Sequence, residues 1–278
     1  MNVVKSLASF RSWRKSRSGR VVFVPTMGAL HHGHAALIRS ARTLAGRKGS
    51  VVVSVFVNPT QFGPKEDFSS YPRPWRQDAA VCRASGADAV FMPSADEMYF
   101  SDRSVSVEES LLSFSLCGRS RPGHFCGVCT VVAKLFLLVQ PTHAIFGEKD
   151  WQQLAIIRRM VRDLNFPVDV RGHPTVRDPD GLAASSRNAF LTASERAQAP
   201  LLHASLQAAA LKKSPAGIAA HAKYLLSQIP HARVDYVEAV DAESLQPLKT
   251  RKLPGRLAAA VFFGGARLID NIPLPPLP

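Results

Sequence analysis

The sequence is poor in cysteine, has no long apolar run and carries no acidic residue before Glu66. Four cysteines in 278 residues are too few for a disulfide-stabilised scaffold and fit a reducing compartment. The longest apolar stretches, residues 51–57 and 131–139, fall well short of the roughly 18 residues that a membrane helix needs. Residues 1–20 are rich in Arg and Ser but lack the apolar core of a secretory signal. These absences predict a cytoplasmic protein with no membrane span.

The charge is strongly unbalanced toward lysine and arginine, with a formal net charge of +14. Such a basic chain raises the alternative of a nucleic-acid-binding protein. The basic residues near the N-terminus are scattered, however, and lack the interleaved aromatic side chains on which single-stranded nucleic acid stacks. We therefore favour a solvated basic surface that attracts anionic small molecules, and we expect no nucleic-acid partner.

Residues 21–34 have the pattern of a strand, a loop and the start of a helix. Val21–Val24 is a short apolar, β-branched run typical of a strand buried on both faces, and Pro25, which has no N–H for the ladder, is expected to end it. Gly28 and Gly33 bracket a tight loop. Beyond the loop, apolar residues recur at the spacing of one helix face: Leu37, Ile38, Ala41, Leu44 and Ala45.

This pattern places His31 and His34 at a helix N-terminus. Backbone N–H groups and the positive end of the helix dipole favour an anion there, and imidazoles add further hydrogen-bond donors. A short His-x-Gly-His motif also recurs by chance in unrelated proteins, so its context decides its meaning. We interpret the loop as a phosphate-binding site for a nucleotide.

Strands and helices alternate along the first part of the chain. Periodicity predicts further strands at 2–5, 50–57, 88–92, 104–107, 142–146 and 168–172, helices at 74–85, 127–139 and from 150 onward, and a loop at 118–124. This alternation is typical of an α/β fold, and it predicts a Rossmann-like domain over residues 1–175 with a parallel sheet between two layers of helices.

The pattern changes from about residue 176. Ala-rich helices are predicted at 193–211 and 216–229, followed by strands at 234–240, 257–263 and 267–272. Because these strands are mostly not separated by helices, residues 176–278 are predicted to form a smaller α+β domain, which we expect to close over the active site.

Three polar segments directly follow predicted strands of the first domain. They are the histidine loop, residues 58–61 and residues 147–150. Ligands of parallel α/β sheets bind at the carboxyl ends of the strands. We therefore expect these segments to meet in one crevice, although they lie far apart in the sequence.

Several motifs, taken in order, carry a family resemblance. They are Pro25–His34, Val55–Phe62, Tyr71–Arg73, Arg121–Phe125, Phe146–Gln153, Ser185–Asn188 and Arg267–Asn271. The sequence resembles the pantothenate synthetase (pantoate:β-alanine ligase) family of the nucleotidyltransferase superfamily. The resemblance covers almost the whole chain and leaves only the proline-rich C-terminal tail outside.

The resemblance implies an ATP-dependent ligase that condenses pantoate with β-alanine to give pantothenate. The reaction would pass through an enzyme-bound pantoyl adenylate and release AMP and pyrophosphate. Mg²⁺ would bridge oxygens of the substrate ATP, and a homodimer is implied because the family is usually dimeric. The alternative within enzymes is another small-molecule nucleotidyltransferase, although a phosphorylated acceptor would need Arg or Lys in place of Gln61 and Gln153.

The resemblance also assigns roles to residues. His31 and His34 would bind the triphosphate, with His34 donating a proton or stabilising charge during attack on the α-phosphate, and Lys149 and Arg187 would supply positive charge. His32 is interpreted as a surface group within the same loop. The full ATP-binding set implied is Met27, Gly28, Ala29, Leu30, His31, His32, Gly33, His34, Gly147, Glu148, Lys149, Asp150, Val176, Ala184, Ser185, Ser186 and Arg187.

Gln61 and Gln153 match glutamines that bind pantoate in the family, with Gln61 also near β-alanine. Amide groups suit this acid, since its hydroxyls and carboxylate need donors and acceptors more than additional charge. Glu66 and Asp78 are possible Mg²⁺ contacts, and the sequence selects neither, so the metal ligands stay unknown.

The Cys126-Gly-Val-Cys129 segment has the spacing of a redox or metal motif. No second cysteine pair or nearby partner completes a zinc site, so we interpret both as ordinary thiols. The family often has Arg in place of Cys126, which puts a local cation contact in doubt, and Ala184 is a milder departure.

Overall fold

The computed structural model describes residues 1–64 and 66–277. By its contacts the chain forms two compact units. The first unit contains Met1–Ser110, Arg121–Glu148 and Ile156–Pro174, and the second contains Leu111–Ser120, Lys149–Ala155 and the chain from Thr175. The sequence predicted one boundary after residue 175; the structure in addition groups two short earlier segments with the second unit.

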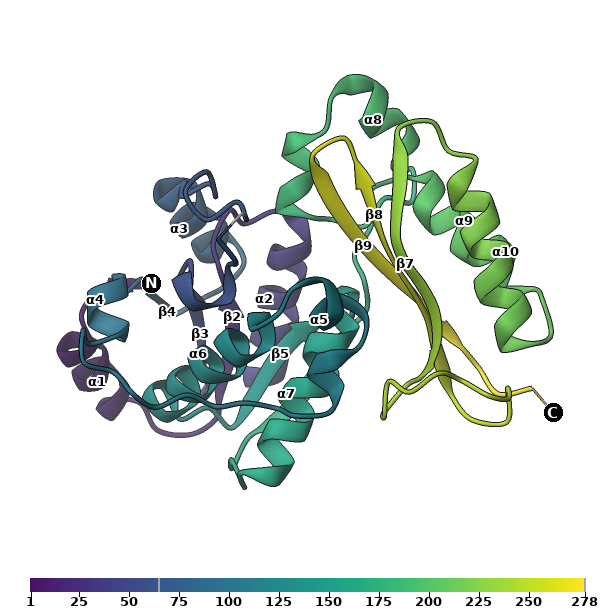
Figure 1. The fold of residues 1–278 in the computed structure, drawn as a ribbon. Coiled ribbons are helices and arrows are strands. Elements are labelled where there is room, and N and C mark those ends of the chain that lie inside the picture. Colours follow the sequence, from purple (N-terminus) through teal and green to yellow (C-terminus); the bar gives the residue numbers. More distant parts are fainter. Residues whose placement is uncertain (65, 278) are drawn as a thin grey trace. The chain divides into compact units, whose positions relative to one another are not determined.

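The first unit is built on a six-stranded parallel sheet in the order β1-β4-β3-β2-β5-β6. The strands are β1 (Asn2–Val4), β2 (Val21–Thr26), β3 (Ser50–Val55), β4 (Ala89–Phe91), β5 (His143–Gly147) and β6 (Asp169–His173). The chain adds β3 and β4 on one side of β2, and later β5 and β6 on the other side (Figure 1). The sheet therefore has its topological switch point between β2 and β5, where ligands of this fold class bind.

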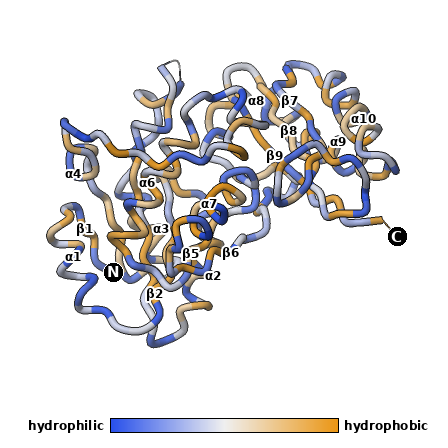
Figure 2. Tube along the Cα trace, turned by 60° about the horizontal axis from the view of Figure 1, so that its bottom comes forward, coloured by the Kyte–Doolittle hydropathy of each residue, from blue (hydrophilic) through white to orange (hydrophobic). Residues whose placement is uncertain are grey.

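Helices cover both faces of this sheet, as predicted. The helices are α1 (Leu7–Lys15), α2 (His32–Ala45), α3 (Trp75–Ala84), α4 (Ala95–Met98), α6 (His124–Val139) and, shared with the second unit, α7 (Trp151–Asp163). Side chains alternate along β2: Val22 and Val24 pack with α2 and α3 residues, whereas Phe23 contacts Phe136 of α6. The sheet thus forms the apolar centre of the unit, drawn in the hydrophobic colours of Figure 2.

The predicted end of β2 at Pro25 is wrong, because the strand continues to Thr26. Backbone groups of successive strand residues point to opposite neighbours. Phe56 N donates to the Thr26 carbonyl on the β3 side, so Pro25 points to the β5 side. The pairing with β5 covers only Val22 and Phe23, so the missing N–H of Pro25 costs no ladder hydrogen bond.

Other predicted elements also differ from the structure. Residues 104–107 do not form a strand; the Val105 side chain is 82% exposed, and the backbone N–H of Val107 donates to the Thr130 hydroxyl of α6 instead of a neighbouring strand. The predicted loop 118–124 contains the end of a short helix, α5 (Leu116–Ser120). The predicted helix 193–211 is split into α8 (Ala193–Gln198) and α9 (Leu201–Ala210), with Pro200 capping α9.

The second unit contains a three-stranded antiparallel sheet in the order β7-β8-β9. Its strands are β7 (Ala232–Asp241), β8 (Gly255–Phe263) and β9 (Ala266–Leu274), and its other elements are α5, α8, α9, α10 (Pro215–Ser227) and the 3-10 turns η2 (Leu112–Phe114), η3 (Glu148–Asp150, which begins in the first unit) and η4 (Ser186–Phe190). One face of the sheet packs against α9 and α10 around buried Leu206, Ile218 and Leu257. The predicted α+β character is confirmed.

No helix in the described part of the chain combines the length and the apolar character needed to cross a membrane.

Helix α6 approaches the turn after β3 closely. That turn is η1 (Pro59–Gln61), and a Cβ atom added to Gly127 of α6 would lie 2.4 Å from the Thr60 carbonyl oxygen. The Gly127 carbonyl accepts a 3.1 Å hydrogen bond from Asn58 Nδ2. Glycine is therefore required in the first turn of this helix, although alanine has the higher intrinsic helix propensity.

We expect Gly127→Ala to destabilise the protein by about 1–3 kcal/mol, because the clash is with backbone that cannot rotate away. Thermal unfolding followed by circular dichroism measures this loss. Gly265→Ala is the matched control, since a Cβ there meets no atom within 4 Å. An unfolding temperature unchanged by Gly127→Ala would contradict the close packing.

Candidate active site

The loop between β2 and α2 is held in an unusual backbone conformation. Gly28 has φ of +89° and Ala29 has φ of +51°, so two successive residues are in the left-handed region. The Thr26 hydroxyl accepts from Gly28 N at 3.2 Å and donates to the Ser54 carbonyl at 2.7 Å, which ties the start of the loop to β3. The turn brings the chain sharply from the strand end into the helix.

The carboxylate of Asp78, in α3, binds backbone amides of this loop. Its Oδ1 accepts from Leu30 N at 2.7 Å and its Oδ2 accepts from Ala29 N at 3.2 Å. A Cβ on Gly28 would lie 2.9 Å from Oδ2, so the loop requires glycine there as well. Burial raises the pKa of Asp78, and the two backbone hydrogen bonds partly oppose that shift. The sequence offered Asp78 only as a metal contact, whereas its oxygens bind the loop.

His31 and His34 cap the N-terminus of α2. His31 Nδ1 accepts from Gly33 N at 3.2 Å, and His34 Nδ1 accepts from His31 N at 3.3 Å. The two ring centroids are 4.1 Å apart. Because each Nδ1 is an acceptor, each neutral ring carries its hydrogen on Nε2, as inferred from these partners. The caps therefore fix both rings as Nε2–H donors.

Part of the backbone at and before the start of α2 is engaged within the protein. The sequence analysis expected backbone N–H groups at the start of the helix to bind an anion. In the structure two amides of the loop, those of Ala29 and Leu30, and two at the helix start, those of His31 and Gly33, donate to groups of the protein itself. His32, between them, is exposed as expected of a surface group.

Gln61, in the turn after β3, is buried and its amide is oriented by Asn58. Its Oε1 accepts from Asn58 Nδ2 at 3.1 Å, and its Nε2 contacts Met27 Sδ at 2.9 Å. Asn58 is itself fixed, since its Oδ1 accepts from the Tyr99 hydroxyl at 2.8 Å. Burial raises the pKa of Tyr99, which keeps that hydroxyl protonated as a donor. Gln61 therefore presents the N–H end of its amide on the side of Met27.

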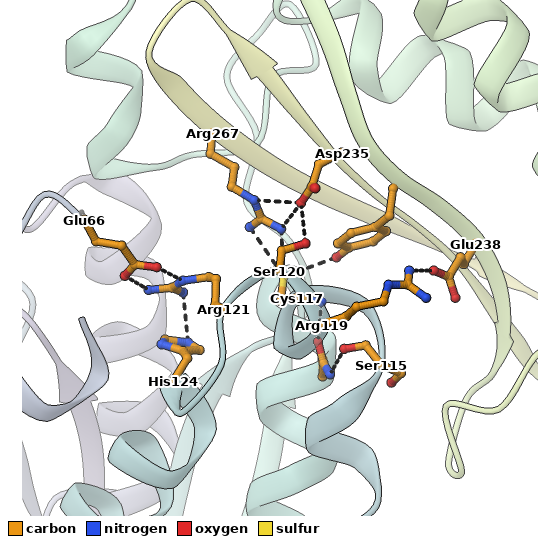
Figure 3. A network of polar contacts seen from close by, with 12 residues as sticks. Glu66, Ser115, Cys117, Arg119, Ser120, Arg121, His124, Asp235, Glu238 and Arg267 are labelled. Atoms are coloured by element: carbon orange, nitrogen blue, oxygen red, sulfur yellow. Dashed lines mark hydrogen bonds and ion pairs between the residues drawn. The ribbon is translucent and has the colours of Figure 1, made fainter. Parts of the chain in front are cut away.

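The backbone of Gln61 is also fixed. Its carbonyl oxygen lies 2.8 Å from His124 Nδ1, and Arg121 lies between His124 and Glu66 (Figure 3). Arg121 donates to both oxygens of Glu66, at 2.7 and 2.6 Å. Burial alone would raise the pKa of Glu66, but the hydrogen bonds and charge of Arg121, the Gly63 N–H and the nearby His124 together lower it. Glu66, the second suggested Mg²⁺ contact, is thus engaged by a guanidinium.

Gly147 and Glu148 lie in the first unit, and the predicted site residues from Lys149 onward belong to the second unit. Lys149 lies in η3, Gln153 in the first turn of α7, and Val176 in the segment before the loop that contains Arg187. Ser185 caps η4 by accepting from Arg187 N at 3.3 Å. Within the first unit, the structure thus places His31 against His34 and Gln61 against Met27. Lys149, Gln153 and Arg187 have separate local settings in the second unit.

Adjacent glutamines at the start of α7 have different surroundings. Gln152 is buried, donates to the carbonyls of Leu112 and Ser115, and accepts from Cys117 N at 2.9 Å. It therefore holds the segment around α5 in place. Gln153 is only partly buried, so the side chain named from the sequence is the one not used in this packing.

The cysteines of the Cys-x-x-Cys segment are free thiols. Burial raises the pKa of Cys129 to about 12, so it has little thiolate character near neutral pH. Within residues 1–64 and 66–277, no three His, Cys, Asp or Glu side chains are grouped to hold a metal ion. For Cys129, this buried environment is typical of an ordinary thiol.

Known proteins resemble this chain along its whole length. The family model described as Pantoate-beta-alanine ligase matches residues 2–273. A pantothenate synthetase from Akkermansia muciniphila is 56% identical, over 91% of this chain and 92% of the relative. One from Geobacter sulfurreducens is 47% identical, over 98% of each.

Solved structures agree with the sequence relatives. Pantothenate synthetase from Thermus thermophilus has a TM-score of 0.93 at 46% identity, covering 99% of this chain and 100% of that one. Pantoate-beta-alanine ligase from Francisella tularensis, complexed with β-γ ATP and β-alanine, has a TM-score of 0.81 at 33% identity, covering 98% and 97%. With the histidine loop at the switch point of a Rossmann-like sheet, these matches show that the chain belongs to the pantoate–β-alanine ligase family.

Proposed function

We propose that His31, His34 and Gln61 are central to the reaction that family membership assigns to this chain. That reaction is the ATP-dependent condensation of pantoate with β-alanine through pantoyl adenylate, with release of AMP and pyrophosphate. The observation that carries the proposal is the pair of imidazoles fixed as Nε2–H donors at the end of β2. ATP and β-alanine as ligands are supported by the Francisella tularensis complex.

In the first step a pantoate carboxylate oxygen attacks the α-phosphorus of ATP. The new P–O bond forms as the bond to the pyrophosphate oxygen breaks, and negative charge increases on the phosphate oxygens. A carboxylate is a weak nucleophile, so catalysis depends on orientation and on donors that stabilise this charge. We assign His31 and His34 to donate to the phosphate oxygens, and Lys149 and Arg187 to supply positive charge.

The caps restrict what His34 does. Its Nδ1 already accepts from His31 N, so a second proton on the ring would break that hydrogen bond. A neutral imidazole that gave up its Nε2 proton would become an unfavourable anion. We therefore assign His34 to charge stabilisation by hydrogen bonding. The other role implied by the resemblance, proton donation, is less compatible with this cap.

Gln61 is assigned to pantoate, with Gln153 as the second amide. Asn58 orients the N–H end of Gln61 toward Met27, and an amide donor matches a hydroxyl or carboxylate oxygen without adding charge. Binding through such fixed groups places the acid for attack and reduces the entropy lost in the reaction.

The remaining nucleotide contacts are proposed from the family match. They are Met27, Gly28, Ala29, Leu30, His32 and Gly33 of the histidine loop, Gly147, Glu148 and Asp150 after β5, and Val176, Ala184, Ser185 and Ser186 of the second unit. Ala29 and Leu30 would contribute carbonyl or side-chain contacts, since their N–H groups bind Asp78.

Mg²⁺ is proposed to enter as part of the substrate, bound to ATP oxygens. The described residues contain no cluster that would form a cage for it, and Asp78 and Glu66 bind the loop amides and Arg121, respectively. Mg²⁺ commonly keeps several waters and binds mainly through substrate phosphates.

In the second step the β-alanine amine, in its neutral form, attacks the acyl carbon of pantoyl adenylate. The C–N bond forms, the C–O bond to AMP breaks, and the nitrogen loses a proton. AMP is a good leaving group, so the step requires a deprotonated amine held close to the acyl carbon.

We further propose that the protein is a cytoplasmic homodimer. Light scattering would detect the dimer as twice the 30.2 kDa chain mass.

AMP release by the purified protein tests the function. We expect it to require both pantoate and β-alanine, with pantothenate formed in equal amount. Coupled AMP detection and mass spectrometry of the product measure this. ATP turnover that needs neither acid nor amine would refute the assignment.

His34→Ala is expected to slow pantoyl-adenylate formation by about 100-fold or more, the usual loss for one preorganised donor. It also removes a cap, at about 1 kcal/mol of stability. Ser6→Ala is the matched control, because Ser6 caps α1 by accepting from Ser9 N. Rapid-quench measurement of adenylate should show the loss in His34→Ala only; an equally active His34→Ala enzyme would exclude this role.

Gln61→Glu is expected to raise the KM for pantoate about 10-fold or more, because a carboxylate replaces the amide donor that faces the acid. The KM for ATP should change less than twofold. Gln77→Glu, an exposed change of the same type in α3, is the control for charge. Steady-state kinetics with each substrate varied decides, and an unchanged pantoate KM would remove Gln61 from the pantoate site.

A further inference from the structure

The motif Arg267-Leu-Ile-Asp-Asn271 in β9 has no role in the reaction described above. In the structure each polar side chain of this motif binds a different part of the second unit. Arg267 contacts Cys117 Sγ at 3.6 Å, Asp270 binds Arg177, and Asn271 binds the backbone of Lys149. The strand is therefore linked to both short segments that the second unit takes from earlier in the chain.

Asp270 is buried and forms a two-point ion pair. Its Oδ2 and Oδ1 accept from Arg177 Nη1 and Nη2 at 2.7 and 2.9 Å, and only 2% of its side chain is exposed. Arg177 forms a β-bridge with Ala183, and its Nη1 also donates to Gly181 O at 3.1 Å. Asp270 thus anchors the base of the hairpin that leads directly into Ser185.

Asn271 binds the other segment. Its Nδ2 donates to the Lys149 carbonyl at 2.9 Å, and its Oδ1 accepts from Arg256 Nη1 at 3.1 Å. The Arg256 guanidinium lies 3.5 Å from the centre of the Trp151 ring, and Trp151 Nε1 donates to the Ala242 carbonyl at 2.9 Å. Lys149 and Trp151, the two neighbours of Asp150, are therefore both attached to the three-stranded sheet or its adjoining turn.

Successive strand residues point to opposite faces of a sheet. Asp270 shares the face of β9 with Leu268 and Ile272, which pack in the α9 and α10 core, and Asn271 points to the opposite face. Two neighbouring positions on one paired strand therefore determine where two separate loops leave the sheet. A strand is a more precise support than a loop for groups that must meet a ligand.

We propose that Asp270 and Asn271 are positioning residues for ATP, with Asn271 setting the place of Lys149 and Asp270, through Arg177, setting the place of the loop Ser185–Arg187. Neither side chain contacts the nucleotide in this proposal. The inference rests on the proposed function, in which Lys149 and Arg187 bind the phosphates.

The same sheet supplies a matched control. Arg267 donates to Asp235 Oδ2 at 2.7 and 3.1 Å (Figure 3). The Arg267 guanidinium and the Tyr236 hydroxyl both contact Cys117 Sγ. This ion pair, like that of Asp270, joins two elements of the second unit, but it supports α5 and neither phosphate-binding segment. Asp235→Asn therefore removes a comparable ion pair without disturbing Lys149 or Arg187.

The test compares Asp270→Asn, Asn271→Asp and Asp235→Asn in the full-length enzyme. Asn271→Asp keeps the acceptor for Arg256 and replaces the donor to Lys149 O by a carboxylate oxygen. We expect Asp270→Asn and Asn271→Asp each to lower kcat/KM for ATP at least 10-fold, with the KM for β-alanine within twofold of wild type. Asp235→Asn should lower the unfolding temperature while leaving kcat/KM for ATP within twofold.

Two outcomes would overturn the proposal while wild type stays active. One is a change of less than twofold in kcat/KM for ATP in folded Asn271→Asp and its second variant, Asn271→Ala. The other is an equal loss in Asp235→Asn, which would show general destabilisation. If Asp270→Asn does not fold, the two Asn271 variants decide alone. An inactive wild-type enzyme would instead refute the proposed function.

Discussion

The candidate site depends on the hydrogen bonds between the buried Asp78 carboxylate and the loop before α2. The carboxylate accepts the amides of Ala29 and Leu30, and thereby holds a backbone turn that alanine rarely adopts. The turn delivers the chain into α2 with His31 at the cap position, and the cap fixes the tautomers of His31 and His34. Burying this carboxylate raises its pKa, and the two amide hydrogen bonds offset part of that cost. One side chain of α3 therefore holds the loop that leads His31 and His34 into the start of α2.

Most of the fold could be predicted because its signals are local. Runs such as Val21–Val24 and Val51–Val53 are apolar on both faces, which is typical of a central parallel strand, and the structure places them at the centre of the sheet. The predictions of strands were wrong where strand formation depends on whether a neighbouring strand is available for pairing. Pro25 is tolerated because β5 no longer pairs at that point, and residues 104–107 have a strand-like alternation but no neighbouring strand in the described chain. Neither fact is contained in the segment itself.

For the candidate site, too, the sequence indicated the local motifs but not the contacts between distant residues. The histidine loop and Gln61 are recognisable because each motif lies within a few residues. The residues that orient them come from distant positions: Asp78 is 48 residues after Leu30, and Tyr99 is 41 residues after Asn58. Arg121 and His124 were recognisable as part of a sequence motif. The contact of His124 with the Gln61 carbonyl, however, follows only from the packing of α6 against η1. Sequence spacing identifies groups that bind; tertiary structure identifies groups that hold them in place.

Local hydrogen-bond donors and the net charge of the molecule have different roles. The groups proposed to contact pantoate and the phosphates in the first unit are amides and imidazoles, and the carboxylates near them are compensated by backbone amides or by Arg121. Directional recognition there needs little net charge, because fixed donors select oxygen atoms by position. The surplus of +14 acts at longer range. A positive field raises the rate at which anionic substrates such as ATP and pantoate encounter the protein, and salt weakens that field. Selectivity and encounter are thus separable, and substitutions of exposed basic residues affect association before they affect chemistry.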